Sequence, residues 1–185
     1  RLSGSLCDAV TRRTDSRALL ERLEHANLFL VPLDQDCAWY RYHRLFADLL
    51  RQRLRMAESF SEAELHRLAS QWFAKEGLFP EAIHHSLAGL DWEQAAGLIG
   101  SQSTLMLRRG ELVTLLGWLK SLPEDVIRAR PHLCSDYGWA LMLTGQLDDA
   151  AVHLDCAERA LQGKDDELGQ IVVAQAYLAR VRGDY

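Results

Sequence analysis

The chain has 185 residues, of which 48% are hydrophobic and 25% are charged. This composition is typical of a globular protein and excludes a disordered tail, a collagen-like rod and a disulfide scaffold. The formal net charge of −5 divides into +3 over residues 1–56 and −8 over residues 57–185. Because binding phosphates needs a basic face, the acidic majority argues against broad nucleic-acid binding, and the first segment is too mildly basic to establish DNA binding.

Residues 1–56 are expected to form a helix, a hairpin and a second helix. Residues 16–26 place their apolar side chains on one helical face. The apolar run at 28–33 and the aromatic-rich segment at 38–42 are separated by turn-forming Asp and Gln residues, which predicts a β-hairpin. Residues 45–54 then return to helical spacing. This order is that of the final part of a winged helix, and we expect strands nowhere else.

Capping residues mark the starts of two predicted helices. Asp15 or Ser16 can cap the helix that covers residues 16–26. Farther along, a Ser-Glu-Ala-Glu sequence fits a capping box, in which Ser61 serves one free amide and Glu64 reaches back to another.

Beyond residue 57 the apolar spacing predicts helices only. Glycines recur at Gly77, Gly110, Gly145 and Gly183, with spacings of 33, 35 and 38 residues. Each glycine closes one amphipathic segment and opens another, as an interhelical turn does in a repeat of paired helices. We therefore expect three or four helix pairs over residues 57–185, the last of them truncated.

One of these units is well defined, and it resembles the tetratricopeptide (TPR) pattern. Small residues at Gly138, Ala150 and Ala157 allow paired helices to approach each other on either side of their turn. Two other units depart from the pattern: Ser86 stands where a large apolar residue is usual, and Leu115 stands where an alanine is expected. We expect irregular packing in the unit that holds Leu115.

The remaining composition features indicate a piece of a longer cytoplasmic protein. No apolar run reaches the roughly 18 residues of a membrane-spanning helix, and no secretion signal follows Arg1. The chain ends at Tyr185, within a predicted helix pair. Its four cysteines are far apart and have no metal-ligand spacing, so we expect buried free thiols and no metal site. They are Cys7, Cys37, Cys134 and Cys156.

The segment WYRYHRLFADLL at residues 39–50 carries the most specific part of a family resemblance. Together with other segments it makes the whole chain similar to the MalT-like regulators, which are ATP-dependent transcription activators of the LuxR type within the STAND class of signal-transduction ATPases. These other segments lie at residues 19–23, 27–33, 72–73, 77, 81–83, 110–111, 118–119, 122–123, 130–131 and 139.

The resemblance implies a place for this chain within a larger regulator. In such proteins an ATPase module is followed by a winged helix, a superhelix of helical repeats that senses inducer, and a DNA-binding helix-turn-helix. Residues 1–56 would be the C-terminal part of the winged helix, and residues 57–185 would be TPR-like repeats. The chain has no Gly-rich phosphate-binding loop with Lys-Ser or Lys-Thr. ATP or ADP is thus expected only in the parent protein, and no enzymatic activity is expected here.

His43 is the candidate nucleotide-sensing residue. It lies at the junction of the predicted aromatic strand and the helix that follows. Related ATPases place a histidine of a Met-His-Asp motif at the corresponding position, where it contacts ADP, but Tyr42 and Arg44 flank the histidine here. An imidazole can donate a hydrogen bond to a phosphate oxygen. The alternative is that His43 only caps or packs the helix start.

A basic face on the helix after the hairpin allows a second interpretation. Arg44, Arg51 and Arg55 fall on one side of this helix, which invites a DNA-binding role. Asp48 lies on the same side and can pair with Arg44 or Arg51. We favour a solvated or interdomain face and expect no direct DNA contact.

Four residues of the best-defined unit occupy the positions that line the concave groove of TPR-like repeats. They are His132, Ser135, Trp139 and Met142. An exposed Trp and Met there would suit a peptide or a small effector. The alternative is that both side chains pack against the next helix pair, as aromatic residues at helical spacing usually do.

These observations lead to one functional hypothesis and one main alternative. We expect a non-catalytic regulatory segment, in which the winged helix relays the nucleotide state of a neighbouring ATPase domain and the repeats receive a small-molecule or protein effector. The alternative is a TPR-type interaction scaffold with no nucleotide coupling. An enzyme with a site assembled from scattered residues is the least favoured interpretation, and no membrane partner is expected.

Overall fold

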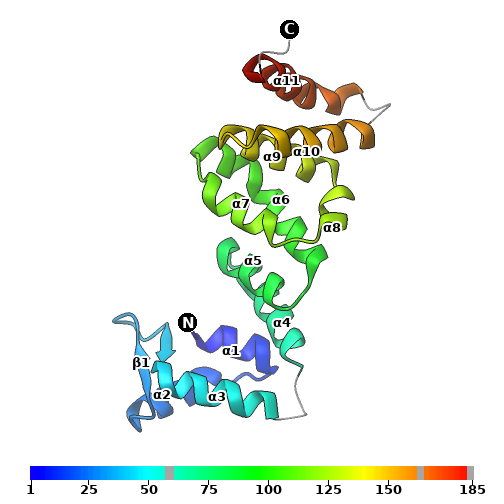
Figure 1. The fold of residues 1–185 in the computed structure, drawn as a ribbon. Coiled ribbons are helices and arrows are strands. Elements are labelled where there is room, and N and C mark those ends of the chain that lie inside the picture. The colour runs from blue at the N-terminus through cyan, green and yellow to red at the C-terminus, as the bar shows by residue number, and fades with distance from the viewer. Residues whose placement is uncertain (57–60, 162–164, 183–185) are drawn as a thin grey trace. The chain divides into compact units, whose positions relative to one another are not determined.

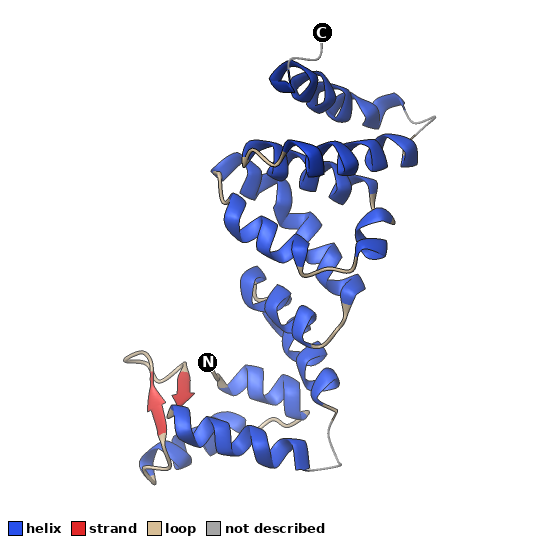
Figure 2. Cartoon of the chain, in the orientation of Figure 1, coloured by secondary structure: helices blue, strands red, loops and turns tan. Residues whose placement is uncertain are grey.

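The computed structural model describes residues 1–56, 61–161 and 165–182 (Figure 1). Helices dominate these residues, with one two-stranded sheet near the N-terminus (Figure 2). The mainly-α class with a single hairpin is therefore confirmed. The chain forms two compact units, Arg1–Leu90 and Asp91–Tyr185, which are described in turn.

The first unit holds the predicted hairpin between helices. Strands β1 and β2 are antiparallel, with Leu30 opposite Tyr42 and Pro32 opposite Tyr40. Leu2 adds two backbone hydrogen bonds to Tyr40 on the outer edge, with N···O distances of 2.7 and 2.8 Å. The elements of this unit are α1 (Gly4–Thr11), α2 (Ser16–His25), β1 (Leu30–Pro32), β2 (Tyr40–Tyr42), α3 (Arg44–Met56), α4 (Glu62–Lys75) and α5 (Phe79–Ala88).

A small apolar core holds the hairpin against α2. Leu20, Leu30 and Tyr40 are buried together, and Cys7 and Cys37 are among the half-buried side chains that pack on them. Tyr40 is only 1% exposed, whereas the next residue of β2, Arg41, is exposed. Alternating burial along β2 therefore determines which side of the hairpin faces the helix.

The helix caps differ from those expected. The Asp15 side chain makes no cap hydrogen bond but pairs with Arg13, while the free Ser16 N–H donates to the Asp8 carboxylate at 3.0 Å. A side chain from α1 thus caps α2, which local spacing did not indicate.

The predicted capping box at the start of α4 was wrong. Ser61 is the residue before the helix, but its side chain makes no cap hydrogen bond. The Glu64 carboxylate instead accepts hydrogen bonds from Arg67 at 2.7 and 2.8 Å and from Arg12 at 3.2 Å. Charged donors within reach compete successfully with a backbone amide for this carboxylate.

The α4–α5 pair explains the unusual Ser86. Its hydroxyl oxygen lies 2.6 Å from that of Ser70 on α4, and both residues are 0% exposed. The pair of hydroxyls replaces one large apolar side chain, because each satisfies the other within a core formed by Phe73, Ala82 and Ile83.

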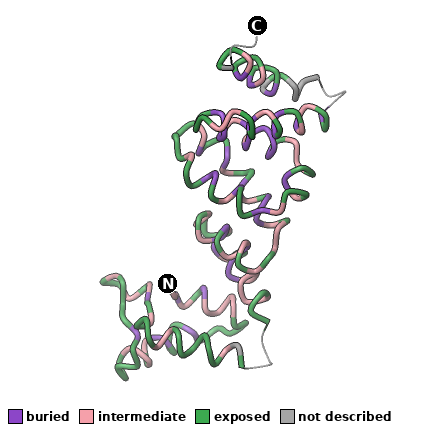
Figure 3. Tube along the Cα trace, viewed as in Figure 1, coloured by how far each residue is buried: buried purple, intermediate pink, exposed green. Residues whose placement is uncertain are grey.

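The second unit consists of helices in its described residues. Figure 3 shows buried positions along α9, whereas the described positions of α3 in the first unit are half-buried or exposed. The elements are α6 (Trp92–Arg109), α7 (Leu112–Lys120), α8 (Glu124–Arg128), α9 (Pro131–Leu143), α10 (Leu147–Ala160) and α11 (Asp165–Arg182).

The turn glycines lie where the spacing placed them. Gly77, Gly110 and Gly145 follow α4, α6 and α9 with φ angles of 74°, 72° and 79°. This left-handed conformation is strained for residues with a Cβ, which explains why glycine ends each helix. Gly183 lies outside the described residues.

The α9–α10 pair packs closely through the predicted small residues. A Cβ added to Gly138 would lie 2.7 Å from Leu154 Cγ, and Ala150 and Ala157 are fully buried. The irregular packing expected around Leu115 stays a prediction. The second helical segment of that unit is divided into α7 and the short α8, with Leu115 0% exposed.

The predicted boundary between residues 56 and 57 stays a prediction. Residues 57–60 lie outside the described part of the chain, and α4 packs against α1 within the first compact unit.

Candidate functional site

His43 lies between β2 and α3, as predicted. Its backbone N–H donates to the Phe29 carbonyl at 2.8 Å, and its carbonyl accepts from the Ala47 N–H at 2.9 Å, which starts α3. The backbone therefore has a structural role, while the side chain is exposed. Both interpretations of His43 remain open, because the helix-start function uses only main-chain atoms and leaves the imidazole available.

Aromatic side chains fix the junction that presents His43. The Phe46 ring contacts Phe29, with centroids 5.2 Å apart, and Tyr42, with centroids 5.5 Å apart. These contacts connect β2 and the residue before β1 to the first turn of α3, so the orientation of His43 depends on the hairpin.

The basic face of α3 is partly neutralised. Arg51 donates to the Asp48 carboxylate at 2.8 Å, so one of the two predicted ion pairs is confirmed. The third member of the predicted face, Arg55, has a side chain outside the described residues. An ion pair at this spacing fits the solvated or interdomain face better than a phosphate-binding surface.

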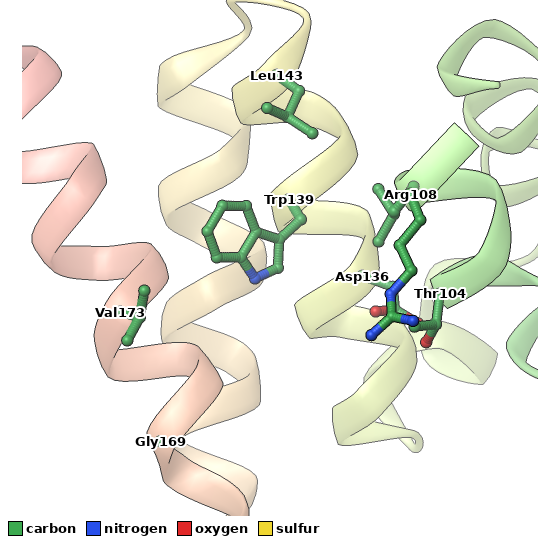
Figure 4. A pocket seen from close by; sticks show the side chains of 8 residues that line it. Thr104, Arg108, Asp136, Trp139, Leu143, Gly169 and Val173 are labelled. Atoms are coloured by element: carbon green, nitrogen blue, oxygen red, sulfur yellow. The ribbon is translucent and has the colours of Figure 1, made fainter. Parts of the chain in front are cut away.

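A groove of ≈ 480 Å³ runs between three helices of the second unit (Figure 4). Most of its lining is apolar, with a few polar groups, as in sites for small ligands. Its lining comprises Thr104, Leu107 and Arg108 of α6, Asp136, Trp139 and Leu143 of α9, and Gly169 and Val173 of α11.

Trp139 occupies the centre of this groove. In Figure 4 its indole lies between Val173 of α11 on one side and the Arg108 guanidinium of α6 on the other. The ring is half-buried, and Arg108 is exposed at the rim. An apolar ring face beside a cation could hold a ligand that has a flat apolar body and a polar end.

Asp136 is the most perturbed ionisable group in the groove. It is half-buried and accepts a hydrogen bond from the hydroxyl of Ser103, which is itself fully buried. Burial raises the pKa of the Asp136 carboxyl above its usual value, and the Ser103 hydrogen bond and the nearby His132 oppose this rise. Such environments are common at binding sites but also occur in structural networks.

The four predicted groove residues do not share one cavity. Trp139 lines the groove, whereas His132 and Ser135 line an adjoining hollow of ≈ 500 Å³ that shares Thr104 and Asp136 with it. Met142 is buried, with 5% exposure. The role of this set stays a prediction, now with Trp139 as its best-placed member.

Sequence reasoning missed Arg108, Asp136 and Val173. Helical spacing assigned residues of α9 to a face, but it did not show which helices cover that face. One signal in the sequence could have indicated this site: Asp136 is an acidic residue one turn before Trp139, on a helix that is largely buried.

Within residues 1–56, 61–161 and 165–182, no group of three or more His, Cys, Asp or Glu residues is placed to hold a metal ion. Over the same residues, no helix combines the length and the apolar character needed to cross a bilayer.

Comparison with known proteins tests the resemblance noted from the sequence. Residues 1–63 match the family model described as the MalT winged helix domain. These residues belong to the MalT winged-helix family. The winged-helix arrangement inferred from the helix–hairpin–helix order is thereby confirmed.

Similarity to known proteins extends beyond the winged helix. The HTH-type transcriptional regulator MalT of Cronobacter sakazakii is 30% identical over 185 residues, which cover 99% of the chain and 20% of that relative. The MalT-like character of the chain is confirmed by this match.

Two further relatives have a different activity in their names. The serine/threonine-protein kinases PknK of Mycobacterium tuberculosis (strain H37Rv) and Mycobacterium bovis are 37% identical over 161 residues, which cover 87% of the chain and 14% of each relative. The chain thus spans a fifth or less of the relatives described here. No solved structure matches it.

Proposed function

We propose that this chain is a non-catalytic regulatory segment of a cytoplasmic, ATP-dependent transcriptional regulator of the LuxR type. In this proposal the helices of the second unit bind a small-molecule or protein effector, and the winged helix relays the nucleotide state of a neighbouring ATPase domain. The observation that carries the proposal is the groove in which Trp139, Asp136 and Arg108 converge from two helices against α11.

The names of the relatives support a regulatory role. One relative is named as a protein kinase and another as a transcriptional regulator, yet both share most of this chain. A segment common to proteins with different named activities fits regulation better than either activity itself. The phosphate-binding loop for ATP or ADP would lie in the parent protein, outside this segment.

His43 is the proposed contact to nucleotide in the parent protein. Its exposed imidazole at the β2–α3 junction can donate to a phosphate oxygen. In the full-length parent, His43→Ala should lower ADP affinity or make transcription independent of inducer. If both nucleotide affinity and basal transcription stay unchanged, His43 acts only through its backbone.

The effector part of the proposal is tested by tryptophan fluorescence. The chain is titrated with a panel of small amphipathic compounds, and the emission is compared between wild type, Trp139→Phe and Trp118→Phe. Trp118 is half-buried and does not line the groove, which makes it the matched control. We expect an emission change that survives in Trp118→Phe and is lost in Trp139→Phe.

Two outcomes would contradict the groove as the effector site. A response that persists in Trp139→Phe places the ligand elsewhere. A ligand that binds by calorimetry with equal affinity to wild type and Trp139→Ala shows that the indole takes no part in binding.

A further inference from the structure

Two thiols meet between α9 and α10, although they are 22 residues apart in the chain. The Sγ atoms of Cys134 and Cys156 lie 3.6 Å from each other, which is van der Waals contact. Cys134 is 0% exposed, and its thiol also points to the Ile127 carbonyl at 3.3 Å. Cys156 is half-buried, so it is the more exposed residue of the two.

The packing of the two helices makes a covalent link between these sulfurs feasible. Gly138 lies one turn after Cys134, and a Cβ there would collide with Leu154, so the backbones of α9 and α10 are close. A disulfide needs an S–S separation of about 2.05 Å, with the two Cα atoms about 5.5–6 Å apart. Closing the remaining gap of roughly 1.5 Å requires a small shift and rotation of the side chains.

We propose that Cys134 and Cys156 are an oxidation site, at which a hydroperoxide converts the two thiols into a reversible disulfide that joins α9 to α10. Cys156 gives its proton to solvent, and its thiolate attacks the peroxide oxygen. The O–O bond breaks to give a sulfenic acid, and the departing alkoxide or hydroxide takes a proton from solvent and leaves as an alcohol or water. The Cys134 sulfur then attacks the sulfenic sulfur, and the departing hydroxyl leaves as water with the Cys134 thiol proton. Both sulfurs are oxidised together by two electrons, and the peroxide is reduced by two.

Exposure and charge decide the order of these steps. Burial raises the pKa of the Cys134 thiol to about 12, with a further contribution from Cys156, so Cys134 stays protonated and enclosed. Thiolates react with peroxide and thiols do not, which assigns the first step to the more exposed Cys156. Cys134 acts second, within a preformed contact.

The location gives the disulfide a consequence for the proposed groove. Asp136 and Trp139 follow Cys134 on the same helix and line the groove. A bond from α9 to α10 would restrict movements of α9 against its partner helix, and so would change how readily the groove adapts to a ligand. Formation of the disulfide itself does not depend on the groove being an effector site.

The experiment uses Cys7→Ser/Cys37→Ser, so that only the two thiols in question remain. The protein is treated with hydrogen peroxide, alkylated, and analysed by intact mass and peptide mapping without reductant. We expect a loss of two hydrogen atoms, protection of both thiols from alkylation, a peptide that links Cys134 to Cys156, and reversal by dithiothreitol. Peptide mapping of the wild-type protein after the same treatment shows whether Cys7→Ser and Cys37→Ser alter formation of the Cys134–Cys156 disulfide.

A matched variant tests whether Cys134 is the thiol that converts oxidised Cys156 into a disulfide. With Cys134→Ser added, we expect oxidation at Cys156 to proceed to the sulfinic acid, because no resolving thiol is present. The proposal is overturned if Cys156 takes up two oxygen atoms in the presence of Cys134, if both thiols remain alkylatable, or if the only disulfides formed join two chains.

Discussion

At the residue scale, the first unit contains a pair of histidines that sequence spacing did not indicate. His66 on α4 and His85 on α5 have their Nδ1 atoms 2.8 Å apart, and the Phe73 ring stacks on His85. A hydrogen bond between two Nδ1 atoms needs one of them protonated and the other not. Helical spacing pairs His85 only with residues of its own helix, whereas its hydrogen-bond partner lies on α4.

This pair predicts a pH dependence of stability. Burial lowers the pKa of His66, and it lowers that of His85 to about 4, with the neighbouring histidines adding to the shift of His85. The unfolded chain takes up these protons near pH 6.5, so the free energy of unfolding should be insensitive to these groups above that pH and fall as the pH drops toward 4. Thermal melts from pH 7 to pH 4 measure this.

The control for the pH experiment is the double variant His66→Gln/His85→Gln. Its melting temperature should fall less steeply over the same range, since only the carboxylates and the remaining histidines still titrate. Parallel curves for the two proteins would show that the pair contributes nothing to acid sensitivity.

The buried serines give a second prediction at this scale. Ser86→Ala should destabilise the chain by about 1–3 kcal/mol, because it leaves the Ser70 hydroxyl buried without its partner. Ser70→Ala/Ser86→Ala should cost less than Ser86→Ala alone, because no polar group is then stranded. Denaturant unfolding gives both values, and a double variant less stable than the single one would contradict this explanation.

At the scale of elements, the α9–α10 pair depends on close backbone approach. Gly138→Ala should destabilise the chain by about 1–3 kcal/mol, because the added Cβ would lie 2.7 Å from Leu154 Cγ and the two helices must separate. Gly97→Ala in α6 is the matched control. Its Cβ would meet nothing within 4 Å, so the variant should be more stable by about 0.5–1 kcal/mol.

Unfolding experiments on these two glycine variants check the packing directly. Equal changes in the free energy of unfolding at Gly138 and Gly97 would mean that both substitutions act only through helix propensity. In that case the structure would accommodate the new Cβ beside Leu154 at no cost in stability.

At the scale of the whole molecule, charge argues against DNA contact. The net charge is −5, and Asp48 pairs with a member of the basic face of α3. In a mobility-shift assay at low salt, the chain should not retain duplex DNA. Specific retention that falls when Arg44 or Arg51 is replaced by Ala would overturn this expectation.

The sequence by itself determined the order and type of the elements. Apolar spacing predicted the helices and the hairpin, and the recurring glycines predicted the turns at Gly77, Gly110 and Gly145. Both kinds of prediction succeed because they depend on local backbone preferences. The MalT-like resemblance was also visible in residues 39–50. Local reasoning failed where a partner came from outside the helix concerned: the Asp8 carboxylate of α1 accepts from the first N–H of α2, and Arg12 reaches Glu64 of α4.

Only the tertiary structure decided which side chains meet. Trp139 could be placed on a helix face from its spacing, but the groove depends on how α6 and α11 lie against α9. Likewise, Cys134 and Cys156 read as unrelated thiols until the close packing at Gly138 brought their sulfurs into contact. The physical reason is that spacing fixes directions within one helix, whereas contacts between helices depend on how side chains interlock across the whole unit.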